Sequence, residues 1–232
     1  MWNGKKKAVT FSYDDGIVYD KKLVEILNKY GLKCTFNLNS GVMSWANSWV
    51  NSGVEIHRMN AKDLPKLYEG HEIAAHCLTH ADLTKCDDDT VRNEIMLDKD
   101  NLERIFNCKI EGMAYPFGTY NDRVVEILKE CNIKYARTTE TTEGASKPAD
   151  LLRLKSACHH KDPRVMDIIK EFINMDENEI KEPQMLYIWG HSYEFEIDNN
   201  WDLFEEICRT LAGRDDIFYG TNSQVLSPFY GQ

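Results

Sequence analysis

Short runs of apolar, β-branched and aromatic residues alternate along this chain with longer segments of helical periodicity. The short runs predict strands at Ala8–Ser12, Thr35–Leu38, Glu72–Ala75, Gly112–Tyr115, Tyr135–Thr138, Arg153–Ser156, Leu186–Gly190 and Ile217–Gly220. The periodic segments predict helices at Asp20–Tyr30, Lys62–Tyr68, Asp89–Phe106, Asn121–Cys131, Pro163–Asn174 and Asn200–Ala212. Such an alternation is typical of βα units on a parallel sheet.

The first predicted helix indicates where the helices lie. Leu23, Ile26 and Leu27 form one apolar stripe, and Gly31 stands where the helix would end. Helices with a single buried stripe suit an outer layer around parallel strands. Seven or eight βα units therefore predict an α/β fold, a distorted (β/α) barrel in one domain that spans residues 1–232. An open doubly wound sheet is the alternative, because periodicity does not show whether a sheet closes.

Composition narrows the classes of partner. The chain has 232 residues and a formal net charge of -10, and it contains no extended run of Lys and Arg, so no nucleic-acid partner is expected. No apolar stretch reaches the length of a signal-peptide core or a membrane span, so no membrane association is expected. The seven cysteines are odd in number and form no CxxC pair, which favours a reducing, cytoplasmic compartment.

Two neighbouring carboxylates, Asp14 and Asp15, follow the first predicted strand and precede Gly16. Active sites of parallel α/β proteins gather at the carboxyl ends of strands. Adjacent residues that leave a strand point in different directions, so one carboxylate could bind a metal while the other faces the metal's water. Taken alone, an Asp-Asp-Gly sequence is also typical of a solvated turn.

His76 and His80 follow the predicted strand that ends at Ala75. If a helical turn begins there, the four-residue spacing places both imidazoles on one side, an arrangement that suits zinc. An HxxxH pair alone is weak evidence for a site. Together with the acidic pair, it supplies the ligands of an Asp-His-His metal site with open positions for water and substrate.

The predicted strand that ends at Gly190 is followed by His191. This histidine could be a satisfied core residue, but amide or ester hydrolysis also needs a proton donor for the leaving group. Between the histidine clusters lies an aromatic turn, whose rings could contact a sugar or fill the end of the barrel. The turn comprises Tyr115, Pro116, Phe117 and Gly118.

These segments, in this order, resemble the motifs of the polysaccharide deacetylase family, carbohydrate esterase family 4, from about Ala8 to His191. The resemblance implies a distorted barrel of seven or eight strands. It implies Asp14 as the general base and His191 as the general acid, with Asp15, His76 and His80 as metal ligands. The residues expected around the oxyanion and the substrate are Tyr115, Pro116, Phe117, Gly118, Trp189, Arg137 and Arg153.

The chain departs from the family pattern near these residues. Ala114 stands where many members carry an arginine that holds the general base. Asp14 therefore needs another cationic partner, and Arg137 and Arg153, near the ends of the following strands, are the candidates. Cys77 stands where the family has Ser or Thr, and no Asp-rich motif that would orient His191 is evident.

The resemblance implies a metal-dependent hydrolase that removes an N-acetyl, or an O-acetyl, group from a polysaccharide or oligosaccharide. The expected divalent metal is zinc, with Co²⁺, Ni²⁺ or Mn²⁺ as alternatives. Two other functions stay open, because a fold does not determine a function. One is hydrolysis of a non-sugar amide at the same metal site, and the other is carbohydrate binding without catalysis.

Overall fold

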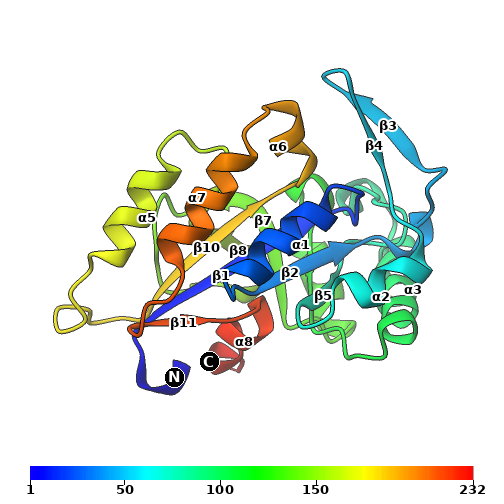
Figure 1. Cartoon of the computed structure of the whole chain (residues 1–232). Helices are drawn as coiled ribbons and strands as arrows, with labels where there is room; N and C mark the ends of the chain where they lie inside the picture. Colours follow the sequence, from blue (N-terminus) through cyan, green and yellow to red (C-terminus); the bar gives the residue numbers. More distant parts are fainter. Residues whose placement is uncertain (232) are drawn as a thin grey trace.

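Nine strands form one sheet in the computed structural model, which describes residues 1–231 (Figure 1). All the pairings between its neighbouring strands are parallel, as the βα pattern predicted. The strands are β1 (Lys7–Asp14), β2 (Cys34–Leu38), β5 (Glu72–Ala75), β6 (Gly112–Ala114), β7 (Tyr135–Thr141), β8 (Leu154–Ser156), β9 (Cys158–His159), β10 (Gln184–Gly190) and β11 (Ile217–Tyr219).

One short segment of chain joins the two edges of this sheet. The strand order is β8-β7-β6-β5-β2-β1-β10-β9, and β11 lies beside the first half of β1. β8 pairs with β7 and β9 pairs with β10, while only Ala157 separates β8 from β9. Residues 154–159 therefore complete a ring of strands, and the predicted distorted barrel is confirmed.

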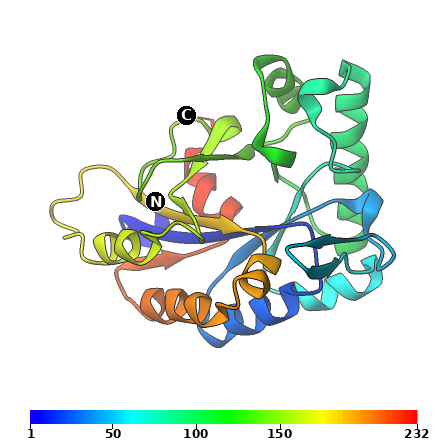
Figure 2. The same cartoon turned by 90° about the horizontal axis from the view of Figure 1, so that it is seen from above.

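The helices are α1 (Asp20–Lys29), α2 (Leu64–Leu67), α3 (Asp88–Phe106), α4 (Asp122–Glu130), α5 (Val165–Ile173), α6 (Tyr193–Ile197), α7 (Trp201–Leu211) and α8 (Asn222–Leu226). Most of them lie outside the strands, as Figure 2 shows from above, whereas α8 contacts the inner face of the ring through Asn222. Helix α7 packs between α1 and α5, and α3 packs against α4 and β5. None of the helices within residues 1–231 combines the length and the apolar character that a membrane span needs.

The two faces of β1 have different surroundings. Val9, Phe11 and Tyr13 belong to the large core that the outer helices cover. On the opposite face, Ala8 packs in a second apolar cluster, whereas Thr10 and Ser12 are polar and buried: Thr10 Oγ1 donates a hydrogen bond of 2.8 Å to Asn222 in α8, and Ser12 accepts one from Asn37. Buried polar groups need such partners. The polar face of β1 continues from Thr10 and Ser12 to Asp14 at the carboxyl end of the strand, and Asp15 follows it.

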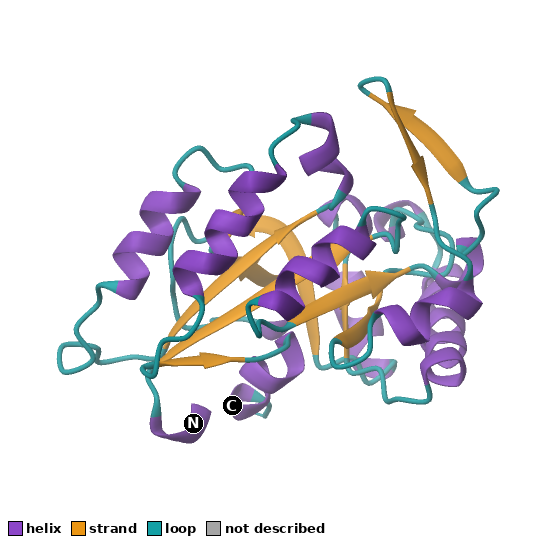
Figure 3. Cartoon of the chain, in the orientation of Figure 1, coloured by secondary structure: helices purple, strands orange, loops and turns teal. Residues whose placement is uncertain are grey.

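Several elements were not predicted from the sequence. The antiparallel hairpin of β3 (Ser48–Asn51) and β4 (Val54–His57) projects away from the barrel, as Figure 3 shows. β3 is mostly exposed and lacks apolar alternation. β4 does alternate Val54 and Ile56 with Glu55 and His57, but only over four residues, the shortest run from which a strand can be predicted, and sequence reasoning missed it. The predicted helix at Lys62–Tyr68 is only the single turn of α2, which a 3₁₀ turn precedes. Strand β9 and helices α6 and α8 are too short for a periodic signal.

Candidate functional site

The carboxyl ends of the barrel strands border a cavity of about 420 Å³. The sequence-predicted residues that line it are Asp14, Asp15, His76, His80, Tyr115, Phe117, Gly118, Arg137, Trp189 and His191. Pro116 is buried at the start of the turn that carries Phe117. The lining also includes four residues that the sequence had not indicated, namely Trp49, Arg58, Thr139 and Tyr193.

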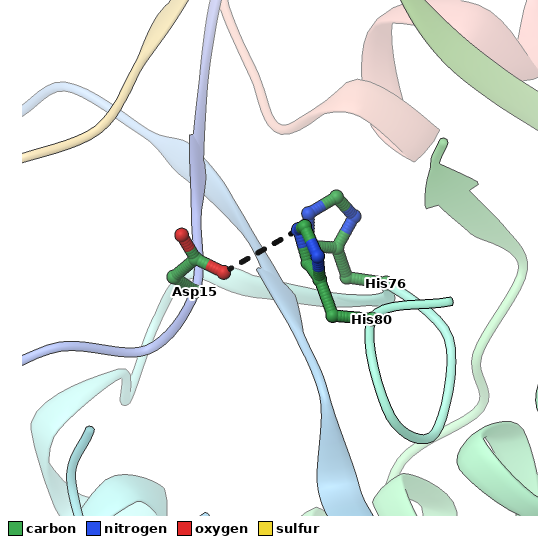
Figure 4. A group of neighbouring side chains, drawn as sticks. All are labelled: Asp15, His76 and His80. Atoms are coloured by element: carbon green, nitrogen blue, oxygen red, sulfur yellow. Dashed lines mark ion pairs between the residues drawn. The ribbon is translucent and has the colours of Figure 1, made fainter. Parts of the chain in front are cut away.

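One carboxylate and two imidazoles lie together in this cavity. Ligand atoms of Asp15, His76 and His80 are all within 4.8 Å of one another, and Figure 4 shows the three side chains side by side, with the ion pair between Asp15 and His80. The Asp15 Oδ1 and His80 Nε2 atoms are 3.9 Å apart. This donor set fits a borderline divalent metal such as zinc, and three protein ligands leave positions for other groups.

A loop, and not the helical turn considered from the sequence, brings His76 and His80 together. Cys77 and His80 both have left-handed backbone conformations, with φ angles of 66° and 65°, and Asp15 has a φ of 83°. Such conformations cost about 1 kcal/mol or more each outside glycine. Their concentration at three neighbouring positions indicates that the surrounding structure maintains this arrangement of side chains.

Hydrogen bonds to neighbouring residues hold the ring and the backbone of His76 in place. Its Nδ1 lies 2.8 Å from the carbonyl oxygen of Ala114, and because a carbonyl only accepts, Nδ1 carries the proton. The Nε2 atom is then the unprotonated nitrogen that can bind a metal. The His76 backbone N–H donates to Asp98 Oδ2 at 3.0 Å, and Asp98 Oδ1 accepts from the Ser40 N–H at 2.7 Å. Burial lowers the pKa of His76 to about 4, so the ring is neutral near pH 7.

Asp14 is a buried carboxylate that is paired with Arg137. Arg137 Nη2 donates to Asp14 Oδ2, and Asn37 Nδ2 donates to Asp14 Oδ1 at 2.8 Å. Burial alone would raise the pKa of Asp14, but the Arg137 guanidinium holds it below its usual value. The carboxylate is therefore ionised at neutral pH and can accept a proton. The Trp189 ring lies 4.2 Å from the guanidinium carbon and covers it.

Only one of the two arginines proposed as partners for Asp14 reaches the site. Ala114, which occupies the position of the family's arginine, is the register partner of Arg137 on the neighbouring strand. The guanidinium therefore reaches Asp14 from β7 and not from β6. Arg153 lies outside the cavity and pairs at 2.7 Å with both Asp122 and Asp150. Because its side chain is directed to these surface carboxylates, the prediction that Arg153 contributes to the substrate site is corrected.

The β3–β4 hairpin supplies a cation that sequence reasoning missed. Arg58, at its base, donates to Asp15 Oδ1 at 2.9 Å and to the Asp15 carbonyl at 2.7 Å, and it also donates to Asn39. Burial alone would raise the pKa of Asp15, but Arg58 and the nearby histidines lower it to about 2. Arg58 therefore keeps this carboxylate ionised and fixes its orientation.

His191 lies close to both carboxylates, Asp14 and Asp15. Its Nε2 atom is 3.9 Å from Oδ2 of Asp14 and 3.9 Å from Oδ2 of Asp15. Burial lowers the pKa of His191, but the neighbouring carboxylates of Glu194, Asp14 and Asp15 outweigh it and raise the pKa to about 9. The imidazole is therefore protonated near pH 7, and it can donate a proton into the cavity.

The aromatic turn after β6 forms one wall of the cavity. Phe117 has a left-handed φ of 59° and is 63% exposed, and its ring meets His80 edge to face with centroids 4.6 Å apart. Gly118 has a φ of 71°, and a Cβ there would lie 2.2 Å from Thr139 Oγ1, so no larger residue fits. The Tyr115 hydroxyl donates to the Leu152 carbonyl. The exposed Phe117 ring is therefore available to a ligand.

The fold places the chain among the α/β barrel proteins, with a carboxylate and two imidazoles that can hold a metal at the carboxyl ends of the strands. Within that class, residues 2–136 match the family model described as Polysaccharide deacetylase, which is more than half of the chain. The chain therefore belongs to the polysaccharide deacetylase family, whose solved members are assigned to carbohydrate esterase family 4.

Two curated relatives are similar over parts of the chain. The uncharacterized protein YlxY of Bacillus subtilis is 28% identical over 134 residues, which are 58% of this chain and 38% of YlxY. A chitin deacetylase of Pestalotiopsis sp. is 37% identical over 81 residues, which are 34% of this chain and 23% of that protein. The chain thus spans well under half of the length of these relatives in the matched regions.

Solved structures share the fold. The Streptococcus pyogenes deacetylase PplD, in complex with acetate, has a TM-score of 0.57 and 28% identity, over 66% of this chain and 64% of that one. A carbohydrate esterase family 4 pseudoenzyme from Bacillus anthracis has a TM-score of 0.59 and 17% identity, over 95% of this chain and 66% of that one. Because pseudoenzymes occur in the family, catalysis has to be argued from the residues of the site.

Proposed function

We propose that this chain is a metal-dependent carbohydrate deacetylase, which hydrolyses an N-acetyl or O-acetyl group and releases acetate. One observation carries the proposal. The ionised Asp14 lies in the same cavity as the group of Asp15, His76 and His80, and the protonated His191 lies 3.9 Å from Asp14. A base, a set of metal ligands and an acid are the parts that acyl hydrolysis needs.

Asp15, His76 and His80 would hold the divalent metal, for which zinc is the best fit and Co²⁺, Ni²⁺ or Mn²⁺ are alternatives. When bound, such a metal supplies Lewis acidity toward the acetyl carbonyl and lowers the pKa of water. Asp14 removes a proton from the attacking water. His191 protonates the departing amine or alcohol, which leaves acetate and a deacetylated sugar.

The walls of the cavity support a sugar as the substrate. Phe117, Trp189, Trp49 and Tyr193 present aromatic rings around the acid and the base, and such rings suit the apolar faces of sugars. In the proposed reaction, the backbone N–H of Phe117 donates a hydrogen bond to the developing oxyanion. One preorganised donor of this kind contributes about 3 kcal/mol. The chitin deacetylase among the relatives makes acetylated glucosamine oligomers the first substrates to test.

The test begins with the metal content of the purified protein, followed by acetate release from acetylated glucosamine oligomers, acetylated xylan and small cyclic amides. Asp14→Asn should keep the metal and lose activity, because the ligand group is untouched, whereas His76→Ala should lose both. Turnover retained in Asp14→Asn would contradict the assigned base. Release from the cyclic amides alone would favour a non-sugar hydrolase, and a metal-free protein that binds oligosaccharides would favour a carbohydrate-binding protein.

A further inference from the structure

Four polar side chains meet on the side of His191 that faces away from the cavity. Glu194 lies in α6, and its Oε2 atom is 3.2 Å from His159 Nε2, 3.3 Å from His160 Nε2 and 3.5 Å from His191 Nδ1. The same oxygen accepts the His191 backbone N–H at 2.9 Å. One carboxylate oxygen therefore faces three imidazole nitrogens, and none of these contacts takes part in the metal-ligand group or in the base.

The Lys161 backbone decides between two interpretations of this cluster. His159, His191 and Glu194 are close enough to hold a metal ion. However, the Lys161 N–H donates to His159 Nδ1 at 3.1 Å, so Nδ1 is the accepting nitrogen and Nε2 carries the proton in the neutral ring. A metal on Nε2 would have to displace that proton. The backbone thus favours a hydrogen bond from His159 to Glu194 over a second metal site.

Glu194 also determines which nitrogen of His191 faces the cavity. Nδ1 of His191 is buried and makes no hydrogen bond within residues 1–231, and its contact with Glu194, at 3.5 Å, is longer than a hydrogen bond. A carboxylate at this distance still favours a proton on Nδ1. Nε2, on the opposite edge of the ring, is then the nitrogen that exchanges a proton with groups in the cavity.

We propose that Glu194, held by His159, is the positioning residue that orients His191 and keeps a proton on its Nδ1. The inference rests on the proposed function, in which His191 is the acid. The chain has no Asp-rich motif that would orient His191. Instead, the carboxylate comes three residues after the histidine and is supported by an imidazole from β9.

Two variants and one matched control test the proposal. Glu194→Ala removes the carboxylate, and Glu194→Gln preserves its shape if the alanine variant does not fold. Glu196→Gln removes the same charge from the same helix at an exposed position that contacts Trp201 and not His191. His159→Leu removes the donor to Glu194, whereas His159→Gln keeps an N–H group and should rescue most of the loss.

The first measurement does not depend on catalysis. Long-range ¹H–¹⁵N correlation spectra of neutral His191 should report a proton on Nδ1 in the wild type and in Glu196→Gln, and a shift toward Nε2–H in Glu194→Ala. The second measurement compares leaving groups. kcat for an acetylated sugar should fall on the order of 10²-fold in Glu194→Ala, whereas kcat for an aryl acetate, which needs no acid, should stay close to that of the wild type.

Two results would overturn the proposal. One is an unchanged His191 tautomer in both Glu194 variants. The other is an equal loss of kcat with the sugar and with the aryl acetate, which a general structural defect would produce. If the wild type releases no acetate from any substrate, the proposed function fails, but the tautomer measurement still decides whether Glu194 positions His191.

Discussion

Replacing Arg137 with methionine would leave the Asp14 carboxylate in the protein interior without its cation. Arg137 is 1% exposed and Asp14 is 2% exposed, so water does not readily replace the guanidinium. Removing one partner of a buried ion pair costs about 3–5 kcal/mol. The guanidinium is also what holds the pKa of Asp14 below its usual value against the effect of burial, so this pKa should rise in Arg137→Met.

The rise in pKa determines the expected loss of activity. Each unit by which the pKa of Asp14 exceeds the assay pH reduces the ionised fraction about tenfold, which corresponds to about 1.4 kcal/mol. We expect kcat/KM for acetate release to fall on the order of 10²-fold near neutral pH, within the usual contribution of a general base. Activity should recover in part as the pH is raised, because Asp14 then ionises again.

The assay measures acetate release against pH, together with urea unfolding and metal content. Arg153→Met is the matched control: the same change at a surface arginine paired with Asp122 and Asp150 should alter stability by less than about 1 kcal/mol and leave activity unchanged. Ala114→Arg in the Arg137→Met background should restore part of the rate, because the two positions are cross-strand neighbours. Full activity of Arg137→Met at neutral pH would refute the reasoning.

Three further predictions concern other residues. Burial raises the pKa of Asp20 to about 7. The stability that protonated Asp20 contributes is therefore fully present below about pH 4, and about 4 kcal/mol of it is lost as the pH rises to about 7. Urea unfolding of Asp20→Asn should lack this loss, and a pH profile equal to that of the wild type would contradict the prediction. Asp98→Asn should weaken metal binding about 10–100-fold in chelator competition, because its NH₂ group would oppose a backbone N–H of Ser40 or His76; unchanged affinity would count against it. Trp49→Ala should raise KM for oligosaccharides but not for a small acetyl ester, and equal effects on both would exclude a role in sugar recognition.

Features that depend on a few neighbouring residues could be predicted from the sequence. Asp14 and His76 each follow a buried strand, and parallel strands bring their carboxyl ends together. The parallel sheet with its outer helices could also be predicted, because the strands and the longer helices carry regular apolar patterns. Closure could not, since residues 154–159 are too few and too irregular to identify as the segment that joins both edges.

Contacts between segments far apart in the sequence could not be predicted. Arg58 reaches Asp15 across 43 positions, and the short apolar alternation of β4 does not indicate which residue the hairpin brings to the site. The choice between Arg137 and Arg153 depends on the register of β6 with β7, which periodicity does not specify. Glu194 lies three residues after His191, but its relation to the imidazole depends on α6, a helix of five residues.

The position of β1 in the ring affects how the protein is made. β1 pairs with β2, but also with β10 and β11, which lie more than 170 residues further along the chain. On a ribosome, β1 emerges first among the strands, and until its later neighbours are made one backbone edge stays unpaired and its apolar side chains stay uncovered. Partners so distant in sequence also slow folding after release. A nascent chain that has not yet reached β10 should therefore be a stronger ligand for chaperones than the finished barrel.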